Sequence, residues 1–176
     1  MIEKRAIILH AWYENPNSQW YQWLKKELEK KDYSILIPDL PTMNSDLPDM
    51  EKMIEKVKSL VDENTIIAGH SLGAVLALRI AERIKYKKAI LVAGWDFNDL
   101  CEEHRLFWKN MIDHKKIKSN VREIYCLSSG NDIFFTANQT ENMSKRLGAK
   151  FILIKGAGHF TRKDGITEVP KILQFI

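Results

Sequence analysis

One short segment constrains the fold of this chain more than any other. The apolar run at residues 65–68 leads into Gly69-His70-Ser71-Leu72-Gly73, and an apolar run with helical periodicity follows at residues 74–81. The pattern predicts a buried strand, a tight turn with a serine at its apex, and a helix. Glycine two positions to either side of the serine suits a turn whose backbone approaches its neighbours too closely for a Cβ atom.

The rest of the chain alternates in the same way. Runs typical of buried parallel strands lie at residues 5–9, 34–37, 65–68, 88–93, 122–127 and 150–154. Segments with helical periodicity lie at residues 18–31, 47–62, 72–84, 136–147 and 168–176. Asn17 or Ser18 is placed to cap the first of these helices and Gly148 to end the fourth. We therefore predict an α/β fold in a single domain over residues 1–176, with about six mostly parallel strands and helices on both faces.

Residues 94–121 interrupt this alternation with a long stretch that has no strand pattern. The stretch contains large apolar side chains, among them Trp95, Phe97 and Trp108. It follows the carboxyl end of a strand, which is where open α/β sheets bind ligands. Two interpretations stay open, namely a helical connector that packs on the sheet and a short insertion over residues 95–121 that lines a pocket.

Composition argues against several classes of protein. The net charge of +4 is small and basic pairs are interleaved with glutamates, so we expect no nucleic-acid binding. Cys101 and Cys126 form no CxxC pair, and metal-binding or nucleotide-binding motifs are absent from the sequence, so we expect no disulfide, metal or cofactor. No apolar run approaches a membrane span or a signal-peptide core. We expect a cytoplasmic protein without membrane association, whose oligomeric state is open and for which a monomer suffices.

The segment around Ser71 also predicts chemistry, because Gly-x-Ser-x-Gly between a strand and a helix is typical of the nucleophile elbow of α/β-hydrolases. A serine hydroxyl needs a base within hydrogen-bond reach, and the base needs a carboxylate to orient it. In α/β-hydrolases the acid and then the histidine follow the serine along the chain. An ordinary glycine-bounded turn is the alternative interpretation.

Candidates for both partners follow predicted strands. Asp132 comes after the strand at 122–127, and His159 comes after the strand at 150–154 in a loop with two glycines. We assign Ser71 as nucleophile, His159 as base and Asp132 as the acid.

Other carboxylates compete for the role of the acid. Asp96 follows the strand at 88–93 and is the rival to Asp132, while Asp39, after the second strand, is a weaker candidate. We favour Asp132 because of its position relative to the serine motif. Capping of its own turn is the alternative role for Asp132.

A serine nucleophile also needs an oxyanion hole of two backbone N–H groups. We expect one from Leu72, at the helix start after the serine. We expect the other from Trp12 in the loop after the first strand, with Ala11 as the next choice. Aromatic residues favour apolar groups in the substrate pocket, and the candidates to line it are Trp12, Trp95, Phe97, Trp108 and Phe134.

Over essentially its full length the chain resembles the small serine hydrolases of the retinoblastoma-binding-protein type, which include bacterial esterase-like members. The matching segments are His10-Ala11-Trp12, the tryptophan-rich run at 20–28, the elbow at 65–71, Asn131-Asp132-Ile133-Phe134 and Gly158-His159-Phe160. The resemblance implies a minimal α/β-hydrolase fold without a large cap domain. It also implies a triad of Ser71, Asp132 and His159 and carboxylesterase-like activity on small substrates.

The chain departs from the pattern of this family at several positions. Relatives usually have glycine in the loop after the first strand, where this chain reads His10-Ala11-Trp12-Tyr13-Glu14. They often have proline after the acid, where this chain has Ile133. The LxCxE motif linked to retinoblastoma binding is absent, since residues 59–63 read Ser-Leu-Val-Asp-Glu, so that partner is not expected.

The sequence therefore predicts a serine hydrolase that cleaves small carboxylic esters, with amides or thioesters as further substrates, through an acyl-enzyme. One alternative is a hydrolase-fold binding protein with a weak or vestigial triad, since fold does not dictate function. Another is acyl transfer, which differs from hydrolysis only in the acceptor of the acyl group.

Overall fold

The computed structural model describes residues 4–18 and 20–176, and in this part of the chain six strands form one sheet. The strand order is β2-β1-β3-β4-β5-β6, and every neighbouring pair is parallel. The strands are β1 (Lys4–Leu9), β2 (Tyr33–Leu36), β3 (Ile66–His70), β4 (Tyr86–Val92), β5 (Val121–Ser129) and β6 (Lys150–Ile154). The predicted α/β architecture is confirmed, and the sheet is parallel throughout.

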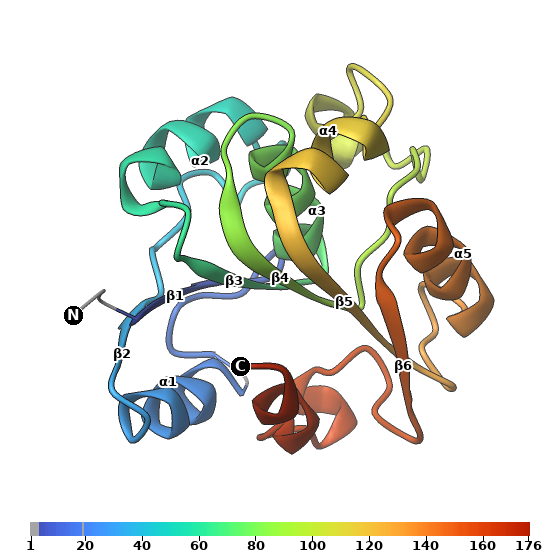
Figure 1. The fold of residues 1–176 in the computed structure, drawn as a ribbon. Coiled ribbons are helices and arrows are strands. Elements are labelled where there is room, and N and C mark those ends of the chain that lie inside the picture. Colours follow the sequence, from blue (N-terminus) through green and yellow to red (C-terminus); the bar gives the residue numbers. More distant parts are fainter. Residues whose placement is uncertain (1–3, 19) are drawn as a thin grey trace.

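Helices cover both faces of the sheet (Figure 1). The α-helices are α1 (Tyr21–Glu29), α2 (Met50–Val57), α3 (Leu72–Ala81), α4 (His114–Asn120) and α5 (Ala137–Leu147). Short 3₁₀ helices are η1 (Lys58–Leu60), η2 (Glu102–Phe107), η3 (Arg162–Asp164) and η4 (Pro170–Phe175). In Figure 1, α1 and the C-terminal segment lie below the sheet, and α2 to α5 lie above it. Each face has its own buried apolar cluster, so the sheet is buried on both sides.

Some local features differ from the sequence predictions. The predicted last helix is the 3₁₀ helix η4, and it begins only at Pro170 because the residue before a proline avoids the helical conformation. Helix α1 has no side-chain cap, and the Ser18 hydroxyl accepts instead from the Asn15 N–H. Gly148 does end α5, with a φ of +64°.

The segment between β4 and β5 packs on the sheet in one part and lines a pocket in the other, so each of the two interpretations considered for it holds for part of the segment. Its second half packs on the core, where Phe107, Ile112 and Ile117 are buried. Its first half, which includes Trp95 and Phe97, lines the pocket at the carboxyl edge of the sheet. Because all strands are parallel, the loops after β1, β3, β4, β5 and β6 meet at this edge.

Candidate active site

The turn between β3 and α3 holds Ser71 in a backbone conformation that serine rarely adopts. Its φ is +53° and its ψ is −121°, and its N–H donates to the carbonyl of Val92 at 2.9 Å. A Cβ atom on Gly69 would lie 2.4 Å from the carbonyl oxygen of Gly73, and one on Gly73 would lie 2.3 Å from that of Leu9. The two glycines therefore let β1, β3 and α3 approach closely enough to form this strained turn.

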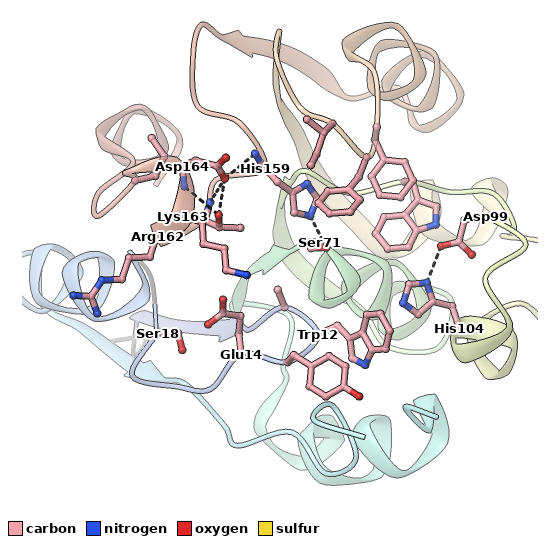
Figure 2. Close-up of a pocket in the computed structure, with 18 of the residues that line it drawn as sticks. Trp12, Glu14, Ser18, Ser71, Asp99, His104, His159, Arg162, Lys163 and Asp164 are labelled. Carbon is pink, nitrogen blue, oxygen red and sulfur yellow. Dashed lines mark hydrogen bonds and ion pairs between the residues drawn. The ribbon is translucent and has the colours of Figure 1, made fainter. Parts of the chain in front are cut away.

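The structure brings the side chains of Ser71, His159 and Asp132 together. His159 Nε2 lies 2.9 Å from Ser71 Oγ (Figure 2), and His159 Nδ1 lies 2.8 Å from Asp132 Oδ2. A carboxylate only accepts hydrogen bonds, so Nδ1 carries a hydrogen and Nε2 is free to accept one from the hydroxyl. The side chains of His159 and Asp132 are 11% and 1% exposed, which shields their hydrogen bond from water.

The two roles considered for Asp132 fall on different oxygens. Oδ2 contacts His159, whereas Oδ1 accepts from the N–H groups of Phe134 at 2.8 Å and Phe135 at 3.3 Å. The turn-capping bonds fix the carboxylate in the orientation in which it meets the imidazole.

The rival acid Asp96 lies elsewhere. Its buried carboxylate pairs with Arg146, at 2.7 Å from Nε and 2.5 Å from Nη2. It also lies 2.7 Å from Nε2 of His114. These contacts engage both oxygens of Asp96 away from His159.

Side chains after β5 and β6 hold the loop of His159. The N–H of Gly158 donates to Asn131 Oδ1 at 2.9 Å, and the N–H of His159 donates to Asp164 Oδ2 at 3.0 Å. Sequence reasoning did not single out Asn131 or Asp164. A signal for Asp164 exists in the sequence, because Thr161 and Asp164 have the spacing of a capping box, which the structure contains.

The N–H groups considered for the oxyanion hole differ in their hydrogen bonding. Among the described residues the N–H groups of Trp12 and Leu72 have no acceptor, whereas that of Ala11 donates to Tyr21 Oη at 3.0 Å. Tyr13 has a φ of +56°, a conformation that glycine adopts freely, and its N–H donates to the Met43 carbonyl at 3.2 Å. A loop without glycine is thus held in a left-handed turn by the neighbouring segment.

A buried chain of hydrogen bonds connects this loop to the loop of His159. Tyr21 Oη, which accepts from Ala11, lies 2.7 Å from His70 Nδ1, and His70 Nε2 lies 2.8 Å from the carbonyl oxygen of His159. The carbonyl only accepts, so Nε2 carries the hydrogen and Nδ1 accepts from the phenol. Burial and then the nearby His159 lower the pKa of His70 to about 3, so the ring is neutral, as this pattern requires. Sequence reasoning did not identify Tyr21.

A pocket at the carboxyl edge contains Ser71 and His159 in its wall (Figure 2). Of the aromatic candidates, the structure places Trp12, Trp95, Phe97 and Phe134 in this wall, together with Phe135, which stacks on Trp95 at 4.2 Å between ring centres. Trp108 lies outside it, contrary to expectation. Its ring packs beside Trp95 with the guanidinium of Arg79 at 5.5 Å, because η2 directs it toward α3.

The two sides of the pocket differ in character. Figure 2 shows Ser71 and His159 between a side with Trp12 and His104 and a side with Glu14, Arg162 and Lys163.

Within residues 4–18 and 20–176, no group of three or more His, Cys, Asp and Glu side chains is placed to hold a metal ion. None of the helices in these ranges is long and apolar enough to cross a membrane.

Comparison with known proteins decides the family. A family model described as serine hydrolase matches residues 6–176. The chain belongs to the serine hydrolase family. The serine hydrolase RBBP9 of Rattus norvegicus is 31% identical over 154 residues, which cover 82% of this chain and 80% of the relative. The predicted family resemblance is thereby confirmed, and the protein is an enzyme of the serine hydrolase type.

Solved structures show the same fold in other hydrolases. YdeN of Bacillus subtilis (strain 168) is 24% identical to this serine hydrolase over 176 residues, which cover 95% of this chain and 91% of YdeN. Its crystal structure matches with a TM-score of 0.88 and covers 98% of this chain and 96% of that one. A protein of the α/β hydrolase superfamily from Xanthomonas campestris pv. campestris, at 14% identity, matches with a TM-score of 0.73 over 99% of this chain and all of its own.

Proposed function

We propose that this serine hydrolase cleaves small carboxylic esters through a triad of Ser71, His159 and Asp132. The observation that carries the proposal is the unbroken hydrogen-bonded chain from Ser71 Oγ through the imidazole of His159 to Asp132 Oδ2. The strained turn at Ser71 supports it, as do the N–H groups of Leu72 and Trp12, which have no acceptor within the described part of the chain. Membership in the serine hydrolase family supports the reaction class.

The first half of the reaction forms an acyl-enzyme. Ser71 Oγ attacks the ester carbonyl while His159 Nε2 takes the hydroxyl proton, and Asp132 holds the ring and stabilises its charged form. The negative charge that develops on the carbonyl oxygen is stabilised by the N–H groups of Leu72 and Trp12. His159 then returns the proton to the departing alcohol.

Water completes the reaction by the same route. It enters the pocket, gives a proton to His159 and attacks the acyl carbonyl, which releases the acid and regenerates Ser71. Amides and thioesters would follow the same steps. The aromatic residues Trp12, Trp95, Phe97 and Phe134 in the pocket wall favour substrates with apolar groups.

The test is intact-mass spectrometry after exposure to a fluorophosphonate, which reacts with an activated serine. We expect one adduct on the wild type, none on Ser71→Ala, and labelling of His159→Ala slowed on the order of 100-fold or more, because the base is lost. His114→Ala, which removes a histidine outside this site, is the matched control and should react like the wild type. An unlabelled but folded wild type, or an adduct that persists in Ser71→Ala, would contradict the proposal and favour a binding protein.

A further inference from the structure

A second histidine–carboxylate pair lies in the pocket wall, and the proposed mechanism does not use it. His104 Nδ1 lies 2.7 Å from Asp99 Oδ2 (Figure 2), and the two side chains are 10% and 12% exposed. The carboxylate only accepts, so Nδ1 carries the hydrogen. His104 Nε2 is buried and has no hydrogen-bond partner in the part of the chain that the structure describes.

The surroundings of this nitrogen are aromatic. The imidazole of His104 lies edge-on to the indole of Trp12, with 4.8 Å between ring centres, and 5.8 Å from the ring of Trp95. All three side chains and Asp99 line the same pocket as Ser71. Figure 2 shows the imidazole extending from the wall at η2 toward Trp12, on the aromatic side of Ser71.

A buried polar atom without a partner is unusual and unfavourable in a folded protein. The contact with Asp99 places a hydrogen on Nδ1, so in the neutral form of the ring Nε2 carries a lone pair. The described residues supply no donor to this lone pair. A ligand that brings a donor into the aromatic side of the pocket would satisfy it.

We propose that His104 Nε2 accepts a hydrogen bond from a hydroxyl group on an aromatic ring of the substrate. This inference rests on the proposed function, since it names the class of ester that the same site prefers. Trp12, Trp95, Phe97 and Phe135 provide aromatic surfaces for such a ring. The hydroxyl supplies the donor that Nε2 lacks in the described part of the chain. Because Nε2 is buried, neighbouring side chains, with Trp12 the nearest ring, must shift as the substrate ring enters.

The test compares matched esters that differ only in one ring substituent. Methyl esters of phenylalkanoic acids and acetates of phenylalkyl alcohols, with linkers of several lengths, are prepared with hydrogen, hydroxyl or methoxy on the ring. Methoxy resembles hydroxyl in polarity but has no hydrogen to donate, so it separates hydrogen bonding from size. Binding to Ser71→Ala is followed by tryptophan fluorescence, which does not depend on turnover.

We expect the best hydroxylated ester to bind more tightly than both analogues, on the order of tenfold to a hundredfold. This ratio of affinities, hydroxylated ester over analogue, should be lost in Ser71→Ala/His104→Phe, which keeps an aromatic ring without its nitrogens. It should shrink in Ser71→Ala/Asp99→Asn, because an amide no longer imposes one tautomer. His114→Phe in the same background is the matched control and should keep the ratio, since His114 pairs with Asp96 outside the pocket.

Equal affinity for the three substituents across the panel would overturn the inference, as would a hydroxyl preference that survives His104→Phe. If His104→Phe does not fold by circular dichroism, the ratio in Asp99→Asn decides. The proposed function is judged separately from wild-type turnover. Ser71-dependent hydrolysis without a hydroxyl preference would contradict only the inference, whereas a preference without turnover would contradict only the proposed function.

Discussion

Tyr21 connects two parts of the site that are far apart in the chain. Its hydroxyl accepts from the N–H of Ala11, beside Trp12, and contacts His70, whose other nitrogen contacts the carbonyl of His159. One fully buried side chain thus holds both the loop of the proposed oxyanion donor and the loop of the proposed base.

Replacing Tyr21 with phenylalanine tests this connection. Tyr21→Phe leaves the Ala11 N–H and His70 Nδ1 unpaired, which should lower the free energy of unfolding by about 1–3 kcal/mol. We expect kcat for a small ester to fall on the order of tenfold with KM little changed, because the lost contacts position groups that act in the transition state.

Tyr86→Phe is the matched control for this experiment. Tyr86 is also fully buried, and its hydroxyl donates to the carbonyl of Ala77, away from the site. It should lower stability, measured by urea unfolding, without lowering kcat. Equal losses of kcat in the two variants would show that Tyr21 acts only through stability.

His70 predicts a dependence of stability on pH. Burial, followed by the charge of His159, lowers its pKa to about 3 in the folded protein, while the unfolded chain has the ordinary value near 6.5. At pH values between these two pKa values, His70 is protonated in the unfolded chain but neutral in the folded protein. Stability contributed by neutral His70 is therefore lost as the pH falls below about 6.5, by up to about 1.4 kcal/mol per pH unit.

Urea unfolding of the wild type and His70→Gln at several pH values measures this effect. We expect His70→Gln to be less stable near neutral pH but to lose less stability between about pH 7 and about pH 5. Histidines that do not interact with His70 affect both proteins alike and cancel in the comparison. Parallel pH profiles would contradict the assignment.

At the scale of elements, the close contact between β1, β3 and α3 decides the geometry at Ser71. All of the residues of α3, from Leu72 to Ala81, are buried, so the helix has no free side toward which it can move. Glycine at positions 69 and 73 permits this approach, because a Cβ atom at either position would lie less than 3 Å from backbone atoms that cannot move away.

Gly73→Ala should break this contact. The new Cβ would lie 2.3 Å from the Leu9 carbonyl oxygen and 2.6 Å from that of His10. We expect the free energy of unfolding to fall by about 3 kcal/mol or more, with loss of fluorophosphonate labelling. Gly130→Ala, where a Cβ meets nothing within 4 Å, should change stability by no more than about 0.5 kcal/mol. Similar melting temperatures for Gly73→Ala and Gly130→Ala would contradict the conclusion that position 73 has no room for a Cβ atom.

At the scale of the whole molecule, the order of the parallel strands gathers the site. The central strand β3 lies between β1 and β4, and β5 and β6 follow on one side. Ser71, Asp132 and His159 come from the ends of β3, β5 and β6, and their side chains meet because parallel strands end at one edge. Asp96 serves this architecture, since its buried carboxylate joins the segment after β4 to α4 and α5.

Arg146→Leu should destabilise the molecule by about 2–4 kcal/mol, because the fully buried carboxylate of Asp96 loses its bidentate partner and, among the described residues, keeps only His114. Adding Asp96→Asn removes the unpaired charge and should recover part of the loss. The measurement is chemical unfolding of the single and double variants. Additive losses in the double variant would show that the pair contributes no interaction free energy.

Local sequence patterns were sufficient for much of this description. Short apolar runs alternating with helical segments predicted the parallel α/β sheet, and glycine spacing predicted the turn at Ser71, because both signals arise from neighbouring residues. Chain order relative to strand ends selected Asp132 and His159, which the structure places within hydrogen-bond distance. Their catalytic roles are what the labelling experiment tests.

Only the tertiary structure decided which distant groups pair and which way long side chains point. Trp95 and Trp108 lie in the same aromatic segment, and the sequence predicted both to line the pocket. Packing places Trp95 in the pocket wall and Trp108 against Arg79. Tyr21 and His70 lie 49 positions apart, and no local pattern joins them. The periodicity of apolar residues indicates which face of a helix or strand is buried. Hydrogen bonds between distant residues, and the exposure of a single aromatic ring, depend instead on how the helices and strands pack together.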